Sequence, residues 1–260
     1  MVKPKIIILR TAGTNCDKET KFAFDLAGGK AELVHINEIA SSRIDLSSYQ
    51  ILAIPGGFSY GDDVAAGKIL ANELTFKLKE QITKFIKQGK LIIGICNGFQ
   101  VLVKAGILSV DSLFKQDISL INNDSGKFED RWTYLKAQNK KCVWARDLPE
   151  VVYFPVAHGE GKFVLDNKKV LGVLKENGQI VFQYSNSKGT LTPYPDNPNG
   201  SLDNIAGICD KTGRILGLMP HPERHIMGSQ HPRWTREGLK KYGDGLLIFK
   251  NGVEYARKHL

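Results

Sequence analysis

Short apolar runs alternate with longer amphipathic segments along positions 1–100 of the chain. Short apolar runs bounded by turn residues are typical of strands covered on both faces of a sheet. We predict four such strands, at residues 5–9, 32–36, 49–54 and 91–95. Helices are predicted over 17–27 and 66–87, the second with an apolar stripe along one side. Strands that alternate with helices indicate an α/β fold with an open, mostly parallel sheet covered by helices.

The second half of the chain has short alternating segments separated by Gly, Asn and Pro. We predict that these are antiparallel strands added to the sheet, at residues 151–156, 179–184, 204–209 and 214–219. A helix interrupted by glycines is predicted over 234–258. Residues 192–200, TPYPDNPNG, concentrate Pro and Asn, which favours a surface loop or lid, or else a plain turn. No repeat or linker divides the chain, so we expect one domain over 1–260.

Composition excludes several classes of protein. No apolar run approaches the roughly 20 residues that cross a bilayer, and the start, MVKPKIIILRTAG, lacks the apolar core of a secretion signal, so we expect a cytoplasmic protein without membrane contact. The four cysteines are scattered without a CxxC pair, which argues against a disulfide framework or a zinc knuckle. The net charge of +9 suits nucleic acid, an anionic partner or a lysine-rich solvated surface. Because no arginine-rich or aromatic-interleaved basic run occurs, we expect no nucleic acid partner.

One cysteine stands where the strand at 91–95 should turn sharply into a helix. Gly94 and Gly98 flank Cys96 at the spacing of a nucleophile elbow, in which small neighbours let the turn close and expose the nucleophile. At a helix N-terminus, backbone N–H groups and the helix dipole favour a thiolate and can hold an oxyanion. The alternative is an ordinary buried core cysteine. The flanking glycines favour a nucleophile for acyl transfer.

A cysteine nucleophile needs a base within hydrogen-bond reach and usually a third group that orients the base. Prolines on both sides hold His221 extended, so Glu223, two positions on, should share its face and fix one imidazole nitrogen. The competing base is His158 in PVAHGEG, which would otherwise be a solvated histidine in a turn. His221 and His225 have the spacing of zinc ligands on a helix, but the prolines argue against a helix there, so we predict no metal.

Together with the motifs in which they stand and four further motifs, these residues resemble the class I glutamine amidotransferases. Within that family, the chain most resembles the glutaminase subunits of phosphoribosylformylglycinamidine synthase, an enzyme of purine biosynthesis. The motifs are GTNCD (13–17), PGGFSYGDD (55–63), GICNGFQ (94–100), DSGKFEDRW (124–132), PVAHGEG (155–161), DNPNGS (196–201) and MPHPER (219–224). The chain departs from the family pattern at 11–12 and at 63–65, in loops expected near glutamine or the synthase partner.

The resemblance implies a flavodoxin-like fold and a triad of Cys96, His221 and Glu223. In that triad Cys96 attacks the side-chain amide of glutamine, His221 protonates the departing ammonia, and Glu223 orients His221. A glutamyl thioester forms, and water then releases glutamate.

The resemblance also implies the groups that hold the substrate. Backbone N–H groups of Gly57 and Asn97 are expected to stabilise the oxyanion of the tetrahedral intermediate, and Gln100 is expected to help hold the substrate amide.

Partners and cofactors follow from the same resemblance. The ammonia is expected to pass to a separate synthetase subunit, which uses ATP and Mg, in a complex with a small accessory subunit. The chain has no Walker-type phosphate loop, so no cofactor is expected in it. Two alternatives are a cysteine hydrolase that acts alone and a binding subunit whose triad has become regulatory. The Pro-His-Pro-Glu placement argues against the first, and the three filled catalytic positions argue against the second.

Overall fold

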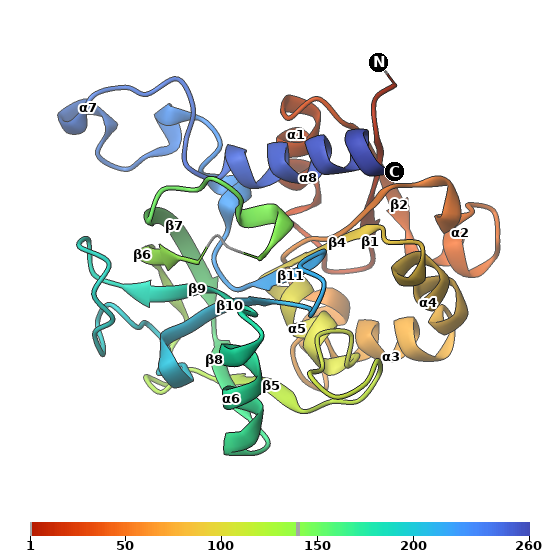
Figure 1. Cartoon of the computed structure of the whole chain (residues 1–260), viewed down its shortest axis with the longest axis horizontal. Coiled ribbons are helices and arrows are strands. Elements are labelled where there is room, and N and C mark those ends of the chain that lie inside the picture. The colour runs from red at the N-terminus through yellow and green to blue at the C-terminus, as the bar shows by residue number, and fades with distance from the viewer. Residues whose placement is uncertain (1, 139–140) are drawn as a thin grey trace.

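A nine-stranded sheet forms the centre of the computed structural model, which describes residues 2–138 and 141–260 (Figure 1). Five neighbouring strands run parallel, in the order β2 (Lys30–His35), β1 (Lys5–Arg10), β3 (Ile51–Ile54), β4 (Leu91–Ile95) and β11 (Ile215–Leu218). Four antiparallel strands continue the sheet, in the order β10 (Ile205–Cys209), β9 (Ile180–Ser185), β6 (Glu129–Ala137) and β7 (Val151–His158). A separate two-stranded sheet pairs β5 (Ile118–Asn122) with β8 (Glu160–Leu165). The predicted α/β fold, mostly parallel with antiparallel strands added, is confirmed.

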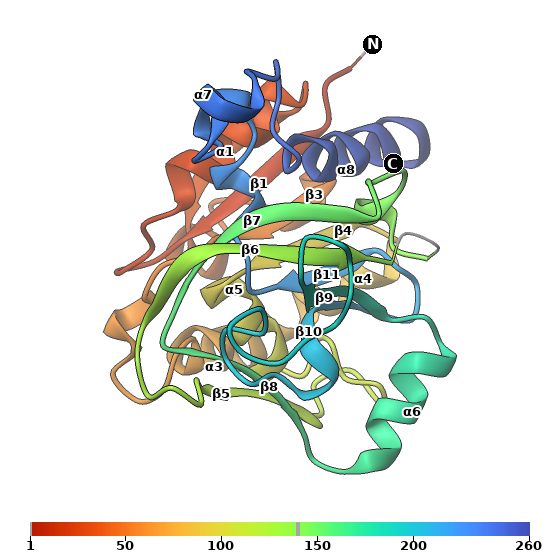
Figure 2. The same cartoon turned by 90° about the vertical axis from the view of Figure 1, so that its left-hand side faces the viewer.

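Helices cover both faces of the parallel part of the sheet (Figures 1 and 2). On one face lie α1 (Asp17–Leu26) and α8 (Leu246–His259), side by side; on the other lie α3 (Lys68–Phe76), α4 (Lys79–Lys87) and α5 (Asn97–Lys104). Three further helices are peripheral: α2 (Ile36–Ala40), α6 (Lys168–Glu176) and α7 (Trp234–Glu237). Of the helices in the described part of the chain, none is long and apolar enough to cross a membrane.

The single helix predicted over 66–87 is wrong, because the chain breaks between α3 and α4. The apolar residues of this segment recur at every fourth position. Four residues turn a helix by about 40° more than a full circle. In one continuous helix the apolar stripe would therefore rotate away from the sheet. A break restores the contact, and Leu78 at the break is buried. The hydroxyl of Thr75 donates to the carbonyls of Ala71 and Asn72, a bond that bends helices.

The helix predicted over 234–258 is also divided, into α7 and α8. The residues between them pack on the backbone that follows β11. At Gly245 a Cβ would lie 2.0 Å from the carbonyl oxygen of Pro222. Only a residue without a side chain fits this approach, so the glycines noted in the sequence serve packing as well as interrupting the helix.

The strand predicted at 214–219 exists as β11, and the predicted antiparallel pairing holds on one of its two sides. It is antiparallel to β10, and it is parallel to β4 on its other side. A short connection between two neighbouring strands makes them antiparallel, so it determines the pairing of β11 with β10 but not the pairing with β4. β11 therefore belongs to the parallel core.

The prediction of a surface loop at 192–200 holds only for the first part of the segment. Tyr194 is exposed, whereas Asn197 and Asn199 are buried and bonded to Ser201. The strands β5, β6 and β8 and the helix α6 were not predicted.

Gly98→Ala is expected to destabilise the fold by about 3 kcal/mol or more, because the new Cβ would lie 1.9 Å from the carbonyl oxygen of Ile54 in β3. The matched control is Gly172→Ala in α6, where a Cβ meets nothing within 4 Å. That change should stabilise the chain by about 0.5–1 kcal/mol, since glycine weakens a helix. Urea unfolding measures the free energy of unfolding of both variants. Equal changes in the two variants would contradict the close approach of α5 to β3.

Candidate active site

Cys96 occupies a strained turn between β4 and α5. Its backbone has φ 51° and ψ −106°, a conformation that residues with a side chain rarely adopt. Its N–H donates to the carbonyl of Leu218 in β11 at 2.8 Å, which fixes the turn to the neighbouring strand. The sharp strand-to-helix turn expected here is present, and only 5% of the residue is exposed.

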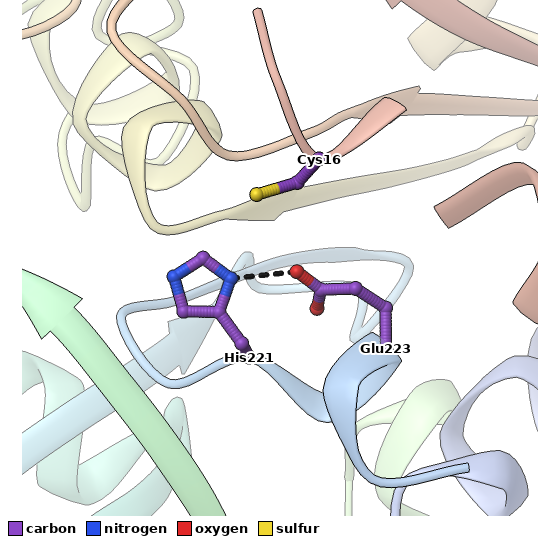
Figure 3. Close-up of side chains that lie close together, drawn as sticks. All are labelled: Cys16, His221 and Glu223. Atoms are coloured by element: carbon purple, nitrogen blue, oxygen red, sulfur yellow. Dashed lines mark hydrogen bonds and ion pairs between the residues drawn. The ribbon is translucent and has the colours of Figure 1, made fainter. Parts of the chain in front are cut away.

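His221 and Glu223 follow β11, the strand that pairs with β4 in parallel. Leu218 pairs with Ile95, so the two strands end at the same edge of the sheet, where α/β sites lie. The Nδ1 atom of His221 is 2.6 Å from Oε1 of Glu223 in the 3₁₀ helix η5 (Pro222–Arg224), and both side chains are buried (Figure 3). The predicted pairing of these two residues is therefore present in the structure.

Cys96 and His221 meet over Gly56. A Cβ placed on Gly56 would lie 2.8 Å from Cε1 of His221 and 3.5 Å from Cβ of Cys96. The other imidazole nitrogen, Nε2, is buried and has no hydrogen-bond partner in the described part of the chain. Since Glu223 occupies Nδ1, Nε2 is the nitrogen left for the sulfur of Cys96.

The environment of His221 favours its charged form. Burial alone would lower its pKa, but the negative charge of Glu223, followed by the contribution of Cys96, raises the pKa well above the ordinary 6.5. A histidine in this state can hold a proton beside sulfur and later deliver it to a leaving group.

His158, the competing base, is buried rather than solvated, so its reading as a histidine in a solvated turn is wrong. The Oδ1 atom of Asn123 accepts from the Gly161 N–H and lies 3.1 Å from Nδ1 of His158, so Nδ1 carries the proton and Nε2 a lone pair. Burial, followed by the charge of His221, lowers the pKa of His158 to about 3. Such a histidine stays neutral and is a weak base.

The groups predicted to hold the substrate lie around the same cavity. Gly57 has φ +138°, and in the described residues neither its N–H nor that of Asn97 donates a hydrogen bond. Gln100 lines the cavity, but its amide already donates to the Glu160 carbonyl and accepts from the Asn97 side chain. The roles of the three residues remain predictions, and for Gln100 the contacts indicate that it braces the wall.

The cavity beside Cys96 measures about 140 Å³. A larger hollow of about 410 Å³ lies against α6 and β9, far from the cysteine and histidine, so size does not locate the chemistry. The cavity is lined by Gly57, Phe58, Asp62, Ala66, Cys96, Gln100, Phe128, Ala157, His158, Gly159 and Glu160.

A second thiol, which was not predicted from the sequence, lies at this site. Cys16 is buried beside the imidazole, and its sulfur, a nitrogen of His221 and an oxygen of Glu223 all lie within 4.8 Å of one another (Figure 3). These are zinc-ligand types. However, Nη2 of Arg224 donates to the Cys16 sulfur at 3.1 Å, so a guanidinium opposes a cation there. Burial raises the pKa of this thiol, and Cys16 packs against the triad as a neutral group.

The only signal for Cys16 in the sequence was its place in the motif GTNCD. Its distance along the chain from His221 gave no chemical reason to connect the two.

Known proteins resemble this chain along nearly its whole length. Residues 3–256 match the family model of the CobB/CobQ-like glutamine amidotransferase domain. The chain is 53% identical over 260 residues to phosphoribosylformylglycinamidine synthase subunit PurQ of Dehalococcoides mccartyi, covering 99% of this chain and 100% of that one. A PurQ subunit of Methanococcus maripaludis is 43% identical, covering 99% of each chain. A chain in the structure of PurLQS from Thermotoga maritima superposes with a TM-score of 0.75 at 29% identity, covering 98% of this chain and 99% of that one.

Replacing Glu223 with Gln should flatten the pH dependence of stability above the ordinary histidine pKa of 6.5. A group whose pKa is higher in the folded chain stabilises the fold below its unfolded-state pKa, and this contribution is lost as pH rises through the folded-state pKa. The free energy of unfolding should therefore fall over that window, and less steeply in Glu223→Gln because the charge that raises the pKa of His221 is removed.

Urea unfolding from about pH 6 to about pH 10 measures this slope. The control is Glu150→Gln, whose side chain is 76% exposed. Equal slopes in the wild type and in Glu223→Gln would contradict charge coupling between Glu223 and His221.

Proposed function

We propose that this chain, which belongs to the family of CobB/CobQ-like glutamine amidotransferase domains, is the glutamine-hydrolysing subunit of a phosphoribosylformylglycinamidine synthase. The family resemblance predicted from the motifs is confirmed by a match that spans residues 3–256. The observation that carries the proposal is the strained Cys96 elbow facing the buried His221–Glu223 pair. It occurs in a chain 53% identical to a PurQ subunit along its whole length.

The proposed reaction begins when Cys96 gives its proton to Nε2 of His221. The thiolate attacks the side-chain amide carbon of glutamine, and the carbonyl oxygen becomes an oxyanion. The imidazolium then returns the proton to the nitrogen as the C–N bond breaks, which releases ammonia and leaves a glutamyl thioester on Cys96. A water, deprotonated by His221, attacks the thioester, the C–S bond breaks, His221 returns the proton to the sulfur of Cys96, and glutamate leaves. Glu223 keeps Nδ1 protonated and stabilises the imidazolium that forms twice in the cycle.

The oxyanion needs donors that point at it before the charge develops. In the proposal these are the N–H groups of Gly57 and Asn97, since Asn97 begins α5 and both residues adjoin the cavity or the nucleophile. The positive end of the α5 dipole acts in the same direction.

The ammonia is proposed to pass to a separate synthetase subunit in a complex with a small accessory subunit. The relative in the structure of PurLQS supports this assembly. We place the use of ATP and Mg on the synthetase, with no cofactor in this chain, and the reaction in the cytoplasm. The match over residues 3–256 to one domain family supports the proposal that the chain is a single glutamine amidotransferase domain.

Cys96→Ala is expected to abolish synthesis from glutamine and to spare synthesis from added ammonia, because only the hydrolysis of glutamine needs the thiol. The measurement is formation of the amidine product by the reconstituted complex with each nitrogen source. Cys209→Ala, a core cysteine in β10, is the control and should retain both activities. Loss of ammonia-dependent synthesis in Cys96→Ala would overturn the assignment.

The isolated chain is expected to hydrolyse glutamine about a hundredfold more slowly than the complex. The peptide between Gly56 and Gly57 can rotate at small steric cost, so the oxyanion donor can point away until a partner fixes the loop. A competent state populated at about one per cent would produce such a loss.

Initial rates of glutamate release, alone and with partner subunits across a salt series, measure this gating. If the surplus of nine positive charges steers docking, association should slow as salt rises. Equal rates for the free and the bound chain would overturn gating and would favour a hydrolase that acts alone.

A further inference from the structure

A gap at Gly56 lies between two thiols, Cys16 and Cys96. The sulfur of Cys16 is 3.1 Å, and the Cβ atom of Cys96 is 3.5 Å, from the position that a Cβ on Gly56 would occupy. Because glycine has no side chain, Gly56 itself does not fill this position. Both thiols are free and buried, and the proposed reaction uses only Cys96. The presence of Cys16 therefore needs an explanation of its own.

The backbone holds each cysteine at this gap. The N–H of Cys16, the N-cap residue of α1, donates to the carbonyl of Gly56 at 3.2 Å, and Cys96 is held by its bond to Leu218. The sulfur of Cys96 lies 3.6 Å from the carbonyl of Ala157, a long and weak contact. Rotations about the two Cα–Cβ bonds therefore bring the sulfurs together while both backbones stay in place.

The surroundings of Cys16 suit a sulfur that attacks. Its thiol donates to Oδ1 of Asn15 at 3.1 Å, and Nη2 of Arg224 donates to the sulfur at 3.1 Å. Burial raises the pKa of this thiol, so it is protonated in the resting chain. When it attacks, the guanidinium stabilises the negative charge on sulfur, and a nitrogen of His221 within 4.8 Å is at hand for the proton (Figure 3).

The two thiols differ in their access to small solutes. Cys96 lines the cavity of about 140 Å³, whereas Cys16 lies outside its lining and is only 1% exposed. A small oxidant that enters the cavity therefore reaches Cys96 first. Cys96 also stands at the N-terminus of α5, where the helix dipole favours a thiolate, and the thiolate is the form that peroxides oxidise.

We propose that Cys16 is the resolving cysteine of a reversible redox switch and forms a disulfide with Cys96 after a peroxide oxidises Cys96. The Cys96 thiolate attacks one oxygen of hydrogen peroxide, the O–O bond breaks, and a sulfenic acid and hydroxide form. The hydroxide takes up the proton that Cys96 gave to His221. The sulfur of Cys16 then attacks the sulfenic sulfur, the S–O bond breaks, and the thiol proton leaves with the hydroxyl group as water. The two cysteines lose two electrons, which the peroxide gains.

The disulfide removes the nucleophile and also protects it. Without a second thiol, a sulfenic acid is oxidised further to a sulfinic acid, which dithiols do not reduce. A dithiol cleaves the disulfide by exchange and restores both cysteines. The effect of the switch on glutamine hydrolysis rests on the proposed function, whereas the formation of the disulfide does not.

The test treats the full chain with hydrogen peroxide, removes the peroxide with catalase and then adds the partner subunits. Synthesis from glutamine should be lost, synthesis from added ammonia should remain, and dithiothreitol should restore most of the lost rate. Mass spectrometry of the digested chain should find the peptides of Cys16 and Cys96 joined, with the loss of two hydrogen atoms.

In Cys16→Ala and Cys16→Ser the same treatment should leave Cys96 as a sulfinic acid. After dithiothreitol, each treated variant should make product from glutamine at least about tenfold more slowly than the same variant without peroxide. Two substitutions are used, each compared with its own untreated rate, so that a packing defect in one does not decide the result. Thermal unfolding checks that both are folded.

The matched control is Cys209→Ala, which removes a buried thiol from β10. It should lose and regain activity as the wild type does, and its peptides of Cys16 and Cys96 should be joined to the same extent.

Each outcome decides a different point. If oxidised wild-type chains carry Cys96 as a sulfinic acid without a link to Cys16, or if the Cys16 variants regain their rate as the wild type does, the switch is wrong although the glutaminase assignment stands. If the two peptides are joined and synthesis from glutamine continues unchanged, Cys96 is not the nucleophile, and the proposed function fails while the disulfide stands.

Discussion

The parallel pairing of β4 with β11 is the constraint on which the site depends. Cys96 follows the first strand and His221 the second, so their side chains meet only because both strands end at the same edge of the sheet. The Cys96 N–H bond to Leu218 locks this register at the turn itself. A shift of one residue along β11 would turn its side chains to the opposite faces and carry His221 away from the sulfur.

The site contains two buried histidines whose surroundings give them opposite properties. Glu223 raises the pKa of His221, whereas burial and the charge of His221 lower the pKa of His158 to about 3. In the sequence each stands in a motif with a carboxylate two positions away, and only the prolines around His221 favoured that histidine as the base. In the folded chain only Glu223 reaches the ring of its histidine, and the Nδ1 atom of His158 faces an amide instead. A pKa depends on neighbours in space, and folding decides which neighbours those are.

The sequence was sufficient to predict the structural features that depend on residues close together in the chain. The turn at Cys96, the extended pairing of His221 with Glu223 and the strands β1 to β4 follow from residues within a few positions of one another. The direction of β11 and the break between α3 and α4 depend on which surfaces the segments meet after folding. The group of Cys16 with His221 and Glu223, and the lining of the cavity beside Cys96, bring together positions from distant parts of the chain, and no periodicity connects them.

The separation of the triad along the chain bears on the synthesis of the protein. From Cys96 to His221 there are 125 positions, the difference of the two residue numbers, and β11 must pair with β4 before the site exists. Contacts this distant form late in folding, because closing the intervening loop costs entropy before any contact rewards it. A nascent chain on the ribosome therefore carries the proposed nucleophile without its proposed base while residues 97–220 are added. The proposed hydrolysis of glutamine can therefore begin only after His221 has been added and β11 has paired with β4.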